Sequence, residues 1–435
     1  MPRACLVEVH VIRYSSSHRE TPRHKAGASR NTLPLFVATY VRLPGTSPGH
    51  LYTSLVLALL TATMLLAGCR NAANNDANQP YKIGFVLALS GAGSVFADSA
   101  RQGMELAIEQ INATNSAGRP IAITIVDDAT DPRTAAEVCN RLVTQERVNA
   151  IIGYENTPSR VACNQAAQRA GIPYVASSMS GGDLCLANLF QVGMVPSQQV
   201  TAMADYLLKS GAKKFYLLGS DYSSPKASFE IAKTYLTAKG AEIVGVSFEP
   251  IGASDFAADL AKISAASPEV VIESLTAADE IPFYKQFRAD TRTAKMKVAS
   301  IELKVSTAKA IGAQAQDVIT ASTYYPSIQS PANEAYLNAM KQKFGDQAQP
   351  SESAMLPFDA AHLLAAAIKA ANTSDGASVT TALRTASWEG PRGKIAFGKG
   401  INYATLDVYI GLAGTDGSFT VKEKASALEP HLNCK

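Results

Sequence analysis

Acidic side chains close two of the apolar runs in this sequence, and their chemistry suits the capture of a cation. The run EVVIESL (269–275) carries Glu273 near its end, and the run KVASIE (297–302) ends on Glu302. If both runs are strands of an open sheet, ligands are expected beyond their carboxyl ends. A carboxylate there can bind an ammonium group. For either residue alone, a solvated or ion-paired glutamate is the ordinary alternative.

Hydroxyl groups follow three other apolar runs. Thr157 stands at the predicted start of a helix, where free backbone N–H groups favour an anion or a polar carbonyl; a plain helix cap explains it equally well. The loop 177–182 exposes Ser178 and Ser180, although an ordinary polar turn has the same composition. Tyr222 follows the strand predicted at 213–220.

Other chemistries find little support in the sequence. Gly91 and Gly93 follow a predicted strand, but the third glycine of a dinucleotide fingerprint is missing. Four of the six histidines precede residue 69, which leaves only His362 and His431 for a metal site or a catalytic triad. Without residues 1–68, which hold seven basic and two acidic residues, the formal charge falls from +3 to −2 and no basic stripe indicates nucleic acid. We therefore expect no cofactor, no metal, no nucleic-acid partner and no enzymatic activity.

The elements that must position these side chains alternate between strand and helix from Tyr81 onward. The pattern predicts two α/β lobes, each Rossmann-like with a mostly parallel sheet, joined by a hinge. Strands are predicted at 82–89, 121–128, 150–153, 172–176, 213–220, 241–248, 269–275 and 297–302. Helices at 332–344, 355–372 and 378–386 follow, and then a hairpin with Asp416 and Gly417 at its turn. The predicted division is lobe 1 at 81–198, lobe 2 at 199–326, a return to lobe 1 at 327–386 and a return to lobe 2 with the C-terminal tail at 387–430.

The segment before this domain predicts export. Residues 51–66 form an uncharged apolar run of signal-peptide length, and it ends in Leu-Ala-Gly before Cys69, as a bacterial lipobox does. We expect residues 1–68 to be a leader, with a mis-assigned start as the simplest account of 1–50, and 69–80 to be a lipidated cysteine with a polar tether. A buried core helix that happens to end in Gly-Cys is the alternative.

An exported compartment permits disulfides between the four cysteines that follow Cys69. Four cysteines allow three pairings, and the sequence alone does not choose among them. Cys139 and Cys163 lie at similar depth in two successive predicted helices, which favours that pair; free buried thiols are the alternative.

Several longer stretches carry a family resemblance over residues 81–429. They include YKIGFVLALSG, DDATDPRTAAE, NLFQVGMVPSQQ, YLLKSGAKKFYLLGSDYSSPK, FGDQAQPSESAMLPFDAAHLLAAAIKAA and WEGPRGKIAF. The chain resembles the type I periplasmic solute-binding proteins of branched-chain amino acid ABC transporters, and it looks nearest to their urea- and short-chain-amide-binding branch.

The resemblance implies a binding site for a small solute. In the amino-acid binders, positions that match Thr157, Ser178 and Ser180 hold the carboxylate. An aromatic residue matches Phe96, and an acid close to Glu302 holds the ammonium group. In the amide binders the matching anchors are tyrosines, here Tyr154 and Tyr222. This sequence departs from both patterns at 177–185 and at Glu273, and its two strand-end acids favour a solute with an amino group.

The resemblance also implies how the protein works. Together with the lipobox before Cys69, it predicts a periplasmic, lipid-anchored monomer that closes its lobes on an amino acid, urea or a short amide and delivers it to the membrane permease of an ABC transporter. The alternative is a ligand-sensing regulatory subunit of the same fold, against which the lipobox argues.

Overall fold

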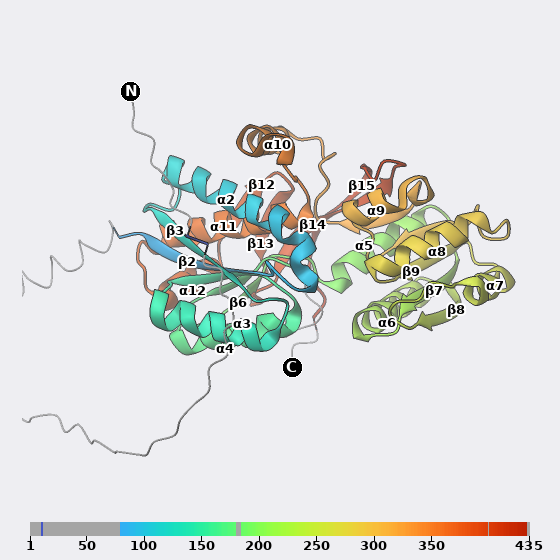
Figure 1. Cartoon of the computed structure of the whole chain (residues 1–435), viewed down its shortest axis with the longest axis horizontal. Coiled ribbons are helices and arrows are strands. Elements are labelled where there is room, and N and C mark those ends of the chain that lie inside the picture. The colour runs from blue at the N-terminus through green and yellow to red at the C-terminus, as the bar shows by residue number, and fades with distance from the viewer. Residues whose placement is uncertain (1–9, 12–78, 180–183, 399, 433–435) are drawn as a thin grey trace, which may run out of the picture. The chain divides into compact units, whose positions relative to one another are not determined.

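The computed structural model describes residues 10–11, 79–179, 184–398 and 400–432, which form two α/β lobes (Figure 1). Lobe 1 is built on a six-stranded sheet with the order β1-β3-β2-β4-β5-β6, in which every pairing is parallel. The strands are β1 (His10–Val11), β2 (Tyr81–Leu87), β3 (Ile121–Asp127), β4 (Ala150–Tyr154), β5 (Tyr174–Ala176) and β6 (Leu189–Gln191).

Helices cover both faces of this sheet. α2 (Ala97–Thr114) and α11 (Glu352–Ala371) pack on one face, and α3 (Pro132–Arg141) and α4 (Thr157–Ala170) on the other (Figure 1). Within β2, Phe85 and Leu87 join the core on the α2 side, whereas Val86 joins the core under α3 and α4. A strand buried on both faces needs apolar side chains at every position, which explains its continuous apolar run.

Lobe 2 is built on a nine-stranded sheet with the order β12-β13-β14-β11-β10-β9-β7-β8, and β15 pairs with β14. The strands β7 to β11 are parallel, and β14 is antiparallel to β11. Its strands are β7 (Lys214–Ser220), β8 (Glu242–Glu249), β9 (Val270–Ser274), β10 (Lys297–Ser300), β11 (Ile319–Ser322), β12 (Ser387–Gly390), β13 (Gly393–Phe397), β14 (Ala404–Ala413) and β15 (Phe419–Leu428). Its helices are α5 (Pro196–Lys209), α6 (Ser223–Ala238), α7 (Ala257–Ala266), α8 (Ala277–Ala289) and α9 (Val305–Ile311).

The chain passes between the lobes three times. It leaves lobe 1 after β6 for α5, returns after β11 through α10 (Pro331–Phe344) to α11, and enters the sheet of lobe 2 again through β12 to β14. α12 (Gly376–Leu383) packs on α11. Gly103 lets α2 approach α11 closely, because a Cβ at this position would lie 1.8 Å from the carbonyl oxygen of Ala354. Four short helical turns complete the described chain: η1 (Ala92–Phe96), η2 (Leu142–Glu146), η3 (Gly312–Ala315) and η4 (Gly345–Gln347).

The structure confirms the predicted fold class and most element positions. Asp131 caps α3 by accepting from the backbone N–H groups of Arg133 and Thr134, and the Asp416–Gly417 turn joins β14 to β15. The short strands β6, β11, β12 and β13 were not predicted. Each has only three to five residues, too few to show a period.

Two local predictions were wrong. Asn156, not Thr157, caps α4: its backbone is extended and its side chain accepts from Ser159 N at 2.8 Å. The strand predicted at 297–302 is β10, which ends at Ser300 and not at Glu302. The hydroxyl of Ser300 accepts from the N–H groups of Glu302 and Leu303, which turns the chain out of the sheet.

Candidate functional site

Glu302 lies in the loop between β10 and α9, at the carboxyl end of the lobe 2 sheet. The hydrogen bond to its carboxylate comes from the hydroxyl of Ser274, at the end of β9, and is long at 3.4 Å. Burial raises the pKa of Glu302, and Lys304 and Ser274 offset part of that rise. Burial also raises the pKa of Tyr222 to about 12, with the negative charge of Glu302 as the next cause. Glu302 and Tyr222 are therefore electrostatic neighbours at one edge of lobe 2.

Lys304, two residues further on, joins this edge to lobe 1. Its ammonium lies 3.0 Å from Oε2 of Glu352, the first residue of α11, and 3.7 Å from Sδ of Met179, which follows β5. Burial by itself lowers the pKa of Lys304, but the charge and hydrogen bond of Glu352, together with the charges of Glu302 and Glu280, outweigh it and the pKa is raised.

Glu352 collects donors on both of its oxygens. Oε1 accepts from the hydroxyl of Ser322 at 2.7 Å, and from the backbone N–H and hydroxyl of Thr323 at 2.9 and 2.8 Å. Burial by itself raises the pKa of Glu352, but Lys304 and these donors outweigh it and lower the pKa to about 2. Glu352 is therefore an anion whose charge is already matched, unlike Glu302.

Tyr154 stands at the end of β4 on the lobe 1 side. Its hydroxyl donates to the hydroxyl of Ser353 at 2.8 Å, on the first turn of α11 next to Glu352. Burial is the main cause that raises the pKa of Tyr154, with the charge of Glu352 adding to it. Tyr154, Ser353, Glu352, Lys304 and Glu302 thus form a chain of neighbours from lobe 1 to lobe 2.

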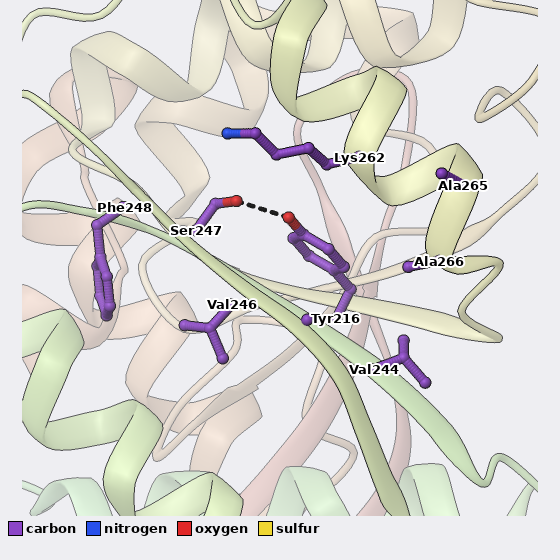
Figure 2. A pocket seen from close by; sticks show the side chains of 9 residues that line it. Tyr216, Val244, Val246, Ser247, Phe248, Lys262, Ala265 and Ala266 are labelled. Atoms are coloured by element: carbon purple, nitrogen blue, oxygen red, sulfur yellow. Dashed lines mark hydrogen bonds between the residues drawn. The ribbon is translucent and has the colours of Figure 1, made fainter.

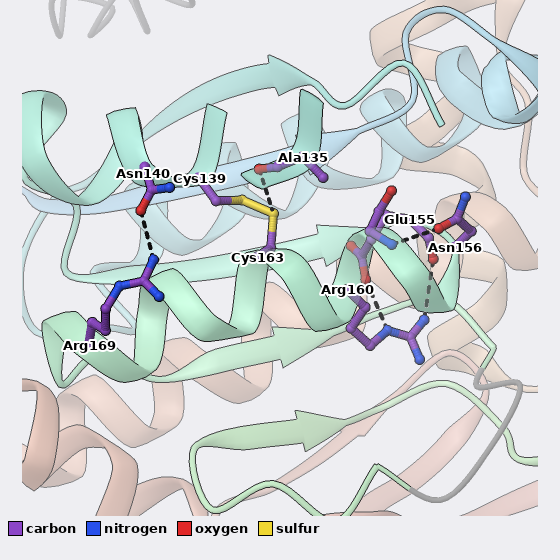
Figure 3. Close-up of a disulfide and its surroundings, with 9 residues drawn as sticks. Ala135, Cys139, Asn140, Glu155, Asn156, Arg160, Cys163 and Arg169 are labelled. Carbon is purple, nitrogen blue, oxygen red and sulfur yellow. Dashed lines mark hydrogen bonds and ion pairs between the residues drawn. A yellow bond between two sulfur atoms is a disulfide. The ribbon is translucent and has the colours of Figure 1, made fainter. Parts of the chain in front are cut away.

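Ser178 belongs to a buried network of lobe 1 centred on Arg160, which Figure 3 shows beside Glu155. Arg160 has no exposed surface and donates to Oε1 of Glu155 at 2.9 Å, to Gln191 at 3.0 Å and to the carbonyl of Met179 at 3.0 Å. The hydroxyl of Ser178 accepts from Arg160 and donates to the carbonyl of Glu155 at 2.6 Å. The network ties the loops that follow β4 and β5 to each other.

The remaining predicted residues lie in lobe 1 or outside the described residues. Thr157 is the first residue of α4, and Phe96 ends η1 as a half-buried side chain after β2. Both therefore follow strands of lobe 1, as the sequence predicts. Ser180 and Cys69 lie outside the described residues.

Glu273 is fully buried inside lobe 2. Its Oε1 accepts from the hydroxyl of Tyr284 at 2.9 Å and its Oε2 from the backbone N–H of Leu275 at 2.9 Å. Burial raises the pKa of Glu273 to about 7, against the lowering effect of Ser300 and these donors. Because both oxygens are bonded within lobe 2, Glu273 does not join the group around Glu302.

The disulfide of lobe 1 joins Cys139 on α3 to Cys163 on α4, with Cα atoms 5.2 Å apart (Figure 3). This is the pair that the sequence favoured. Both residues are fully buried in the core under these two helices. Cys185 is also disulfide-bonded.

A hollow of about 740 Å³ lies on lobe 2 away from these residues (Figure 2). Val244 and Val246 of β8 line it, as do Lys262 of α7 and the hydroxyls of Tyr216 and Ser247, which are 2.6 Å apart. No residue of the predicted site lines this hollow. We therefore place the candidate site at the strand ends around Glu302.

Three charged residues of this region were not predicted from the sequence. Lys304 and Glu352 are 48 positions apart and meet only through the fold. Arg160 sits within a polar stretch of α4, where its spacing gives no sign of burial. The capping serine Ser351 marks the start of α11 and was the one available signal for Glu352.

Comparisons with known proteins agree on one family. Residues 80–417 match the model described as periplasmic binding protein. The Leu/Ile/Val-binding protein homolog 7 of Brucella suis is 25% identical over 374 residues, which cover 80% of this chain and 90% of that protein.

Solved structures share the fold. A solute-binding protein of an ABC transporter from Rhodopseudomonas palustris, in complex with 3,4-dihydroxybenzoic acid, has a TM-score of 0.70 and 25% identity, and the match covers 80% of this chain and 98% of that one. The branched-chain amino acid transporter substrate-binding protein LivJ of Streptococcus pneumoniae, in complex with isoleucine, has a TM-score of 0.66 and 24% identity, with 81% and 100% covered.

Proposed function

Since the chain belongs to the periplasmic binding protein family, we propose that it captures a small solute carrying an amino group, of the amino-acid type. In this proposal the two lobes close on the solute in the periplasm, and the complex delivers it to the membrane permease of an ABC transporter. We further propose a monomer anchored through a lipid on Cys69. No step of this function requires covalent chemistry.

The amino-group proposal rests on how few hydrogen bonds the carboxylate of Glu302 receives. Its carboxylate is half-buried at the strand ends of lobe 2, and among the described residues its one hydrogen bond is the long 3.4 Å contact from the hydroxyl of Ser274. Its neighbour Lys304 is bonded to Glu352 instead. A half-buried carboxylate with unused acceptor capacity is stabilised by a charged donor, and a solute ammonium group supplies one.

Lobe 1 supplies the opposite wall in this proposal. Thr157, the first residue of α4, and Ser180 meet the solute's carboxylate. Phe96 provides an apolar contact. The hydroxyl of Ser178 is committed to Arg160 and Glu155, so its contribution is to hold the loop in place.

A solute of the urea or short-amide type is the second candidate. It is favoured by Tyr154 and Tyr222, which stand on opposite sides of the candidate site. The hydroxyl of Tyr154 donates to Ser353 and so keeps lone-pair capacity for an amide N–H. In this reading the two tyrosines are the anchors and Glu302 is not.

A thermal-shift screen of the full chain separates the two candidates. The panel holds L-leucine and other amino acids, urea, short amides and hydroxybenzoates. A solute at a hundred times its dissociation constant stabilises the folded state by about 2.7 kcal/mol, which is readily measured. Stabilisation by amino acids supports the amino-group proposal, whereas stabilisation by urea or amides alone moves the assignment to the second candidate.

The variant Glu302→Gln then tests the role of the carboxylate. We expect its affinity for the stabilising amino acid to fall by about 1.5–3 kcal/mol, because a charged hydrogen bond is replaced by a neutral one. Glu230→Gln, at an exposed position on α6, is the matched control and should bind normally. Unchanged affinity in Glu302→Gln would remove the ammonium role.

A further inference from the structure

Lys304 belongs to lobe 2, yet its contacts lie in segments that belong to lobe 1. It is the N-cap residue of α9, directly after the loop that follows β10. Its ammonium contacts Glu352 on α11, which packs on α2 of lobe 1, and Met179, which follows β5. The side chains of Lys304 and Glu352 are only 28% and 11% exposed, so solvent weakens this ion pair less than a surface pair.

The other donors to Glu352 lie beside a segment that connects the two lobes, unlike Lys304. Ser322 ends β11 and Thr323 follows it, at the point where the chain leaves lobe 2 for α10 and α11. These bonds join residues beside a connection between the lobes, so a rotation about that connection moves them little. Lys304 is not part of a connection, and its contact with Glu352 separates when the lobes move apart.

We propose that Lys304 is a positioning residue for solute binding, which holds the two lobes in the binding arrangement before a solute arrives. The inference rests on the proposed function only in taking lobe closure as the binding step. An apparent affinity is the intrinsic affinity scaled by the fraction of protein in the competent form. Lys304 therefore raises the affinity for a solute by increasing this fraction, without touching the solute.

Small-angle X-ray scattering of the solute-free full chain tests this directly. The variant Lys304→Met keeps the length of the side chain and removes its charge. We expect its closed-to-open ratio to fall about fivefold, which corresponds to about 1 kcal/mol, so that its radius of gyration exceeds that of the wild type. Lys309→Met, an exposed lysine on the same helix, is the matched control and should scatter like the wild type.

Two further measurements separate positioning from a structural role. Lys304→Arg should restore the wild-type radius, because arginine also pairs with a carboxylate. Raising the salt concentration should expand the wild type toward Lys304→Met and leave that variant unchanged. Identical radii for wild type and Lys304→Met at low salt would overturn the proposal. Since no solute is used, that result is independent of which solute binds.

Discussion

His362 makes the stability of this protein depend on pH in a way that the structure sets. It lies on α11 with 8% of its surface exposed, stacked on Trp388 at a ring distance of 4.2 Å and an interplanar angle of 5°. Phe358 packs nearby at a ring distance of 4.6 Å. The nitrogen Nε2 has no hydrogen-bond partner among the described residues. Burial between rings therefore disfavours the charged imidazolium and lowers the pKa of His362 to about 4.

The size of the stability loss follows from the difference between the pKa of His362 in the folded chain and in the unfolded chain. Because the folded pKa lies below the ordinary value of 6.5, the unfolded chain binds the proton first. Stability from this residue is complete above pH 6.5, declines as the pH falls through 6.5, and stops declining below about pH 4. At about 1.4 kcal/mol per pH unit, the loss is about 2 kcal/mol at pH 5 and about 3 kcal/mol at pH 4.

Urea unfolding at a series of pH values measures this loss, and Trp388, the only tryptophan, reports the transition by fluorescence. Glu155 and Glu273 oppose the trend, since burial raises each pKa to about 7 and the two residues stabilise the fold as the pH falls. The comparison is therefore between the wild type and His362→Phe, in which these contributions cancel. We expect the wild type to lose about 2 kcal/mol relative to the variant between pH 7.5 and pH 5. Parallel curves would refute the assignment.

Two further predictions concern lobe 1. Arg160→Met should lower the free energy of unfolding by about 3–5 kcal/mol in urea titrations, because Glu155 then stays buried without its partner. Arg169→Met, on the exposed part of the same helix, is the control, and a loss in Arg160→Met no larger than in the control would count against this role. Replacing Cys139 and Cys163 together by alanine should cost about 3 kcal/mol, as expected for a bridge across 24 residues. A change in midpoint too small to resolve would contradict that estimate.

The fold could be predicted largely from the sequence because its elements are local in origin. The apolar runs of β2 and β4 and the cap of α3 by Asp131 each depend on residues close together in the chain. The prediction failed where two neighbouring residues could each cap the same helix. Asn156 and Thr157 are both good cap residues, and only the backbone conformation shows that Asn156 is the cap.

The candidate site was harder to predict because its partners are distant in the chain. The alternation of strands placed Tyr154, Tyr222 and Glu302 at strand ends, but no local pattern pairs Lys304 with Glu352. Burial of Arg160 depends on partners that follow β4 and β5 and on one at the end of β6, which a helical period does not record.

Glu273 and Glu302 show why equivalent positions in a sequence can have different roles in a fold. Glu273 lies within β9, where its side chain points toward α8 and both oxygens are bonded by Tyr284 and Leu275. The next residue, Ser274, points to the opposite side of the strand and reaches Glu302. Glu302 lies beyond the end of its strand, and within the described part of the chain no helix of lobe 2 donates a hydrogen bond to its carboxylate. In the proposed function, the ammonium group of the solute pairs with this charge.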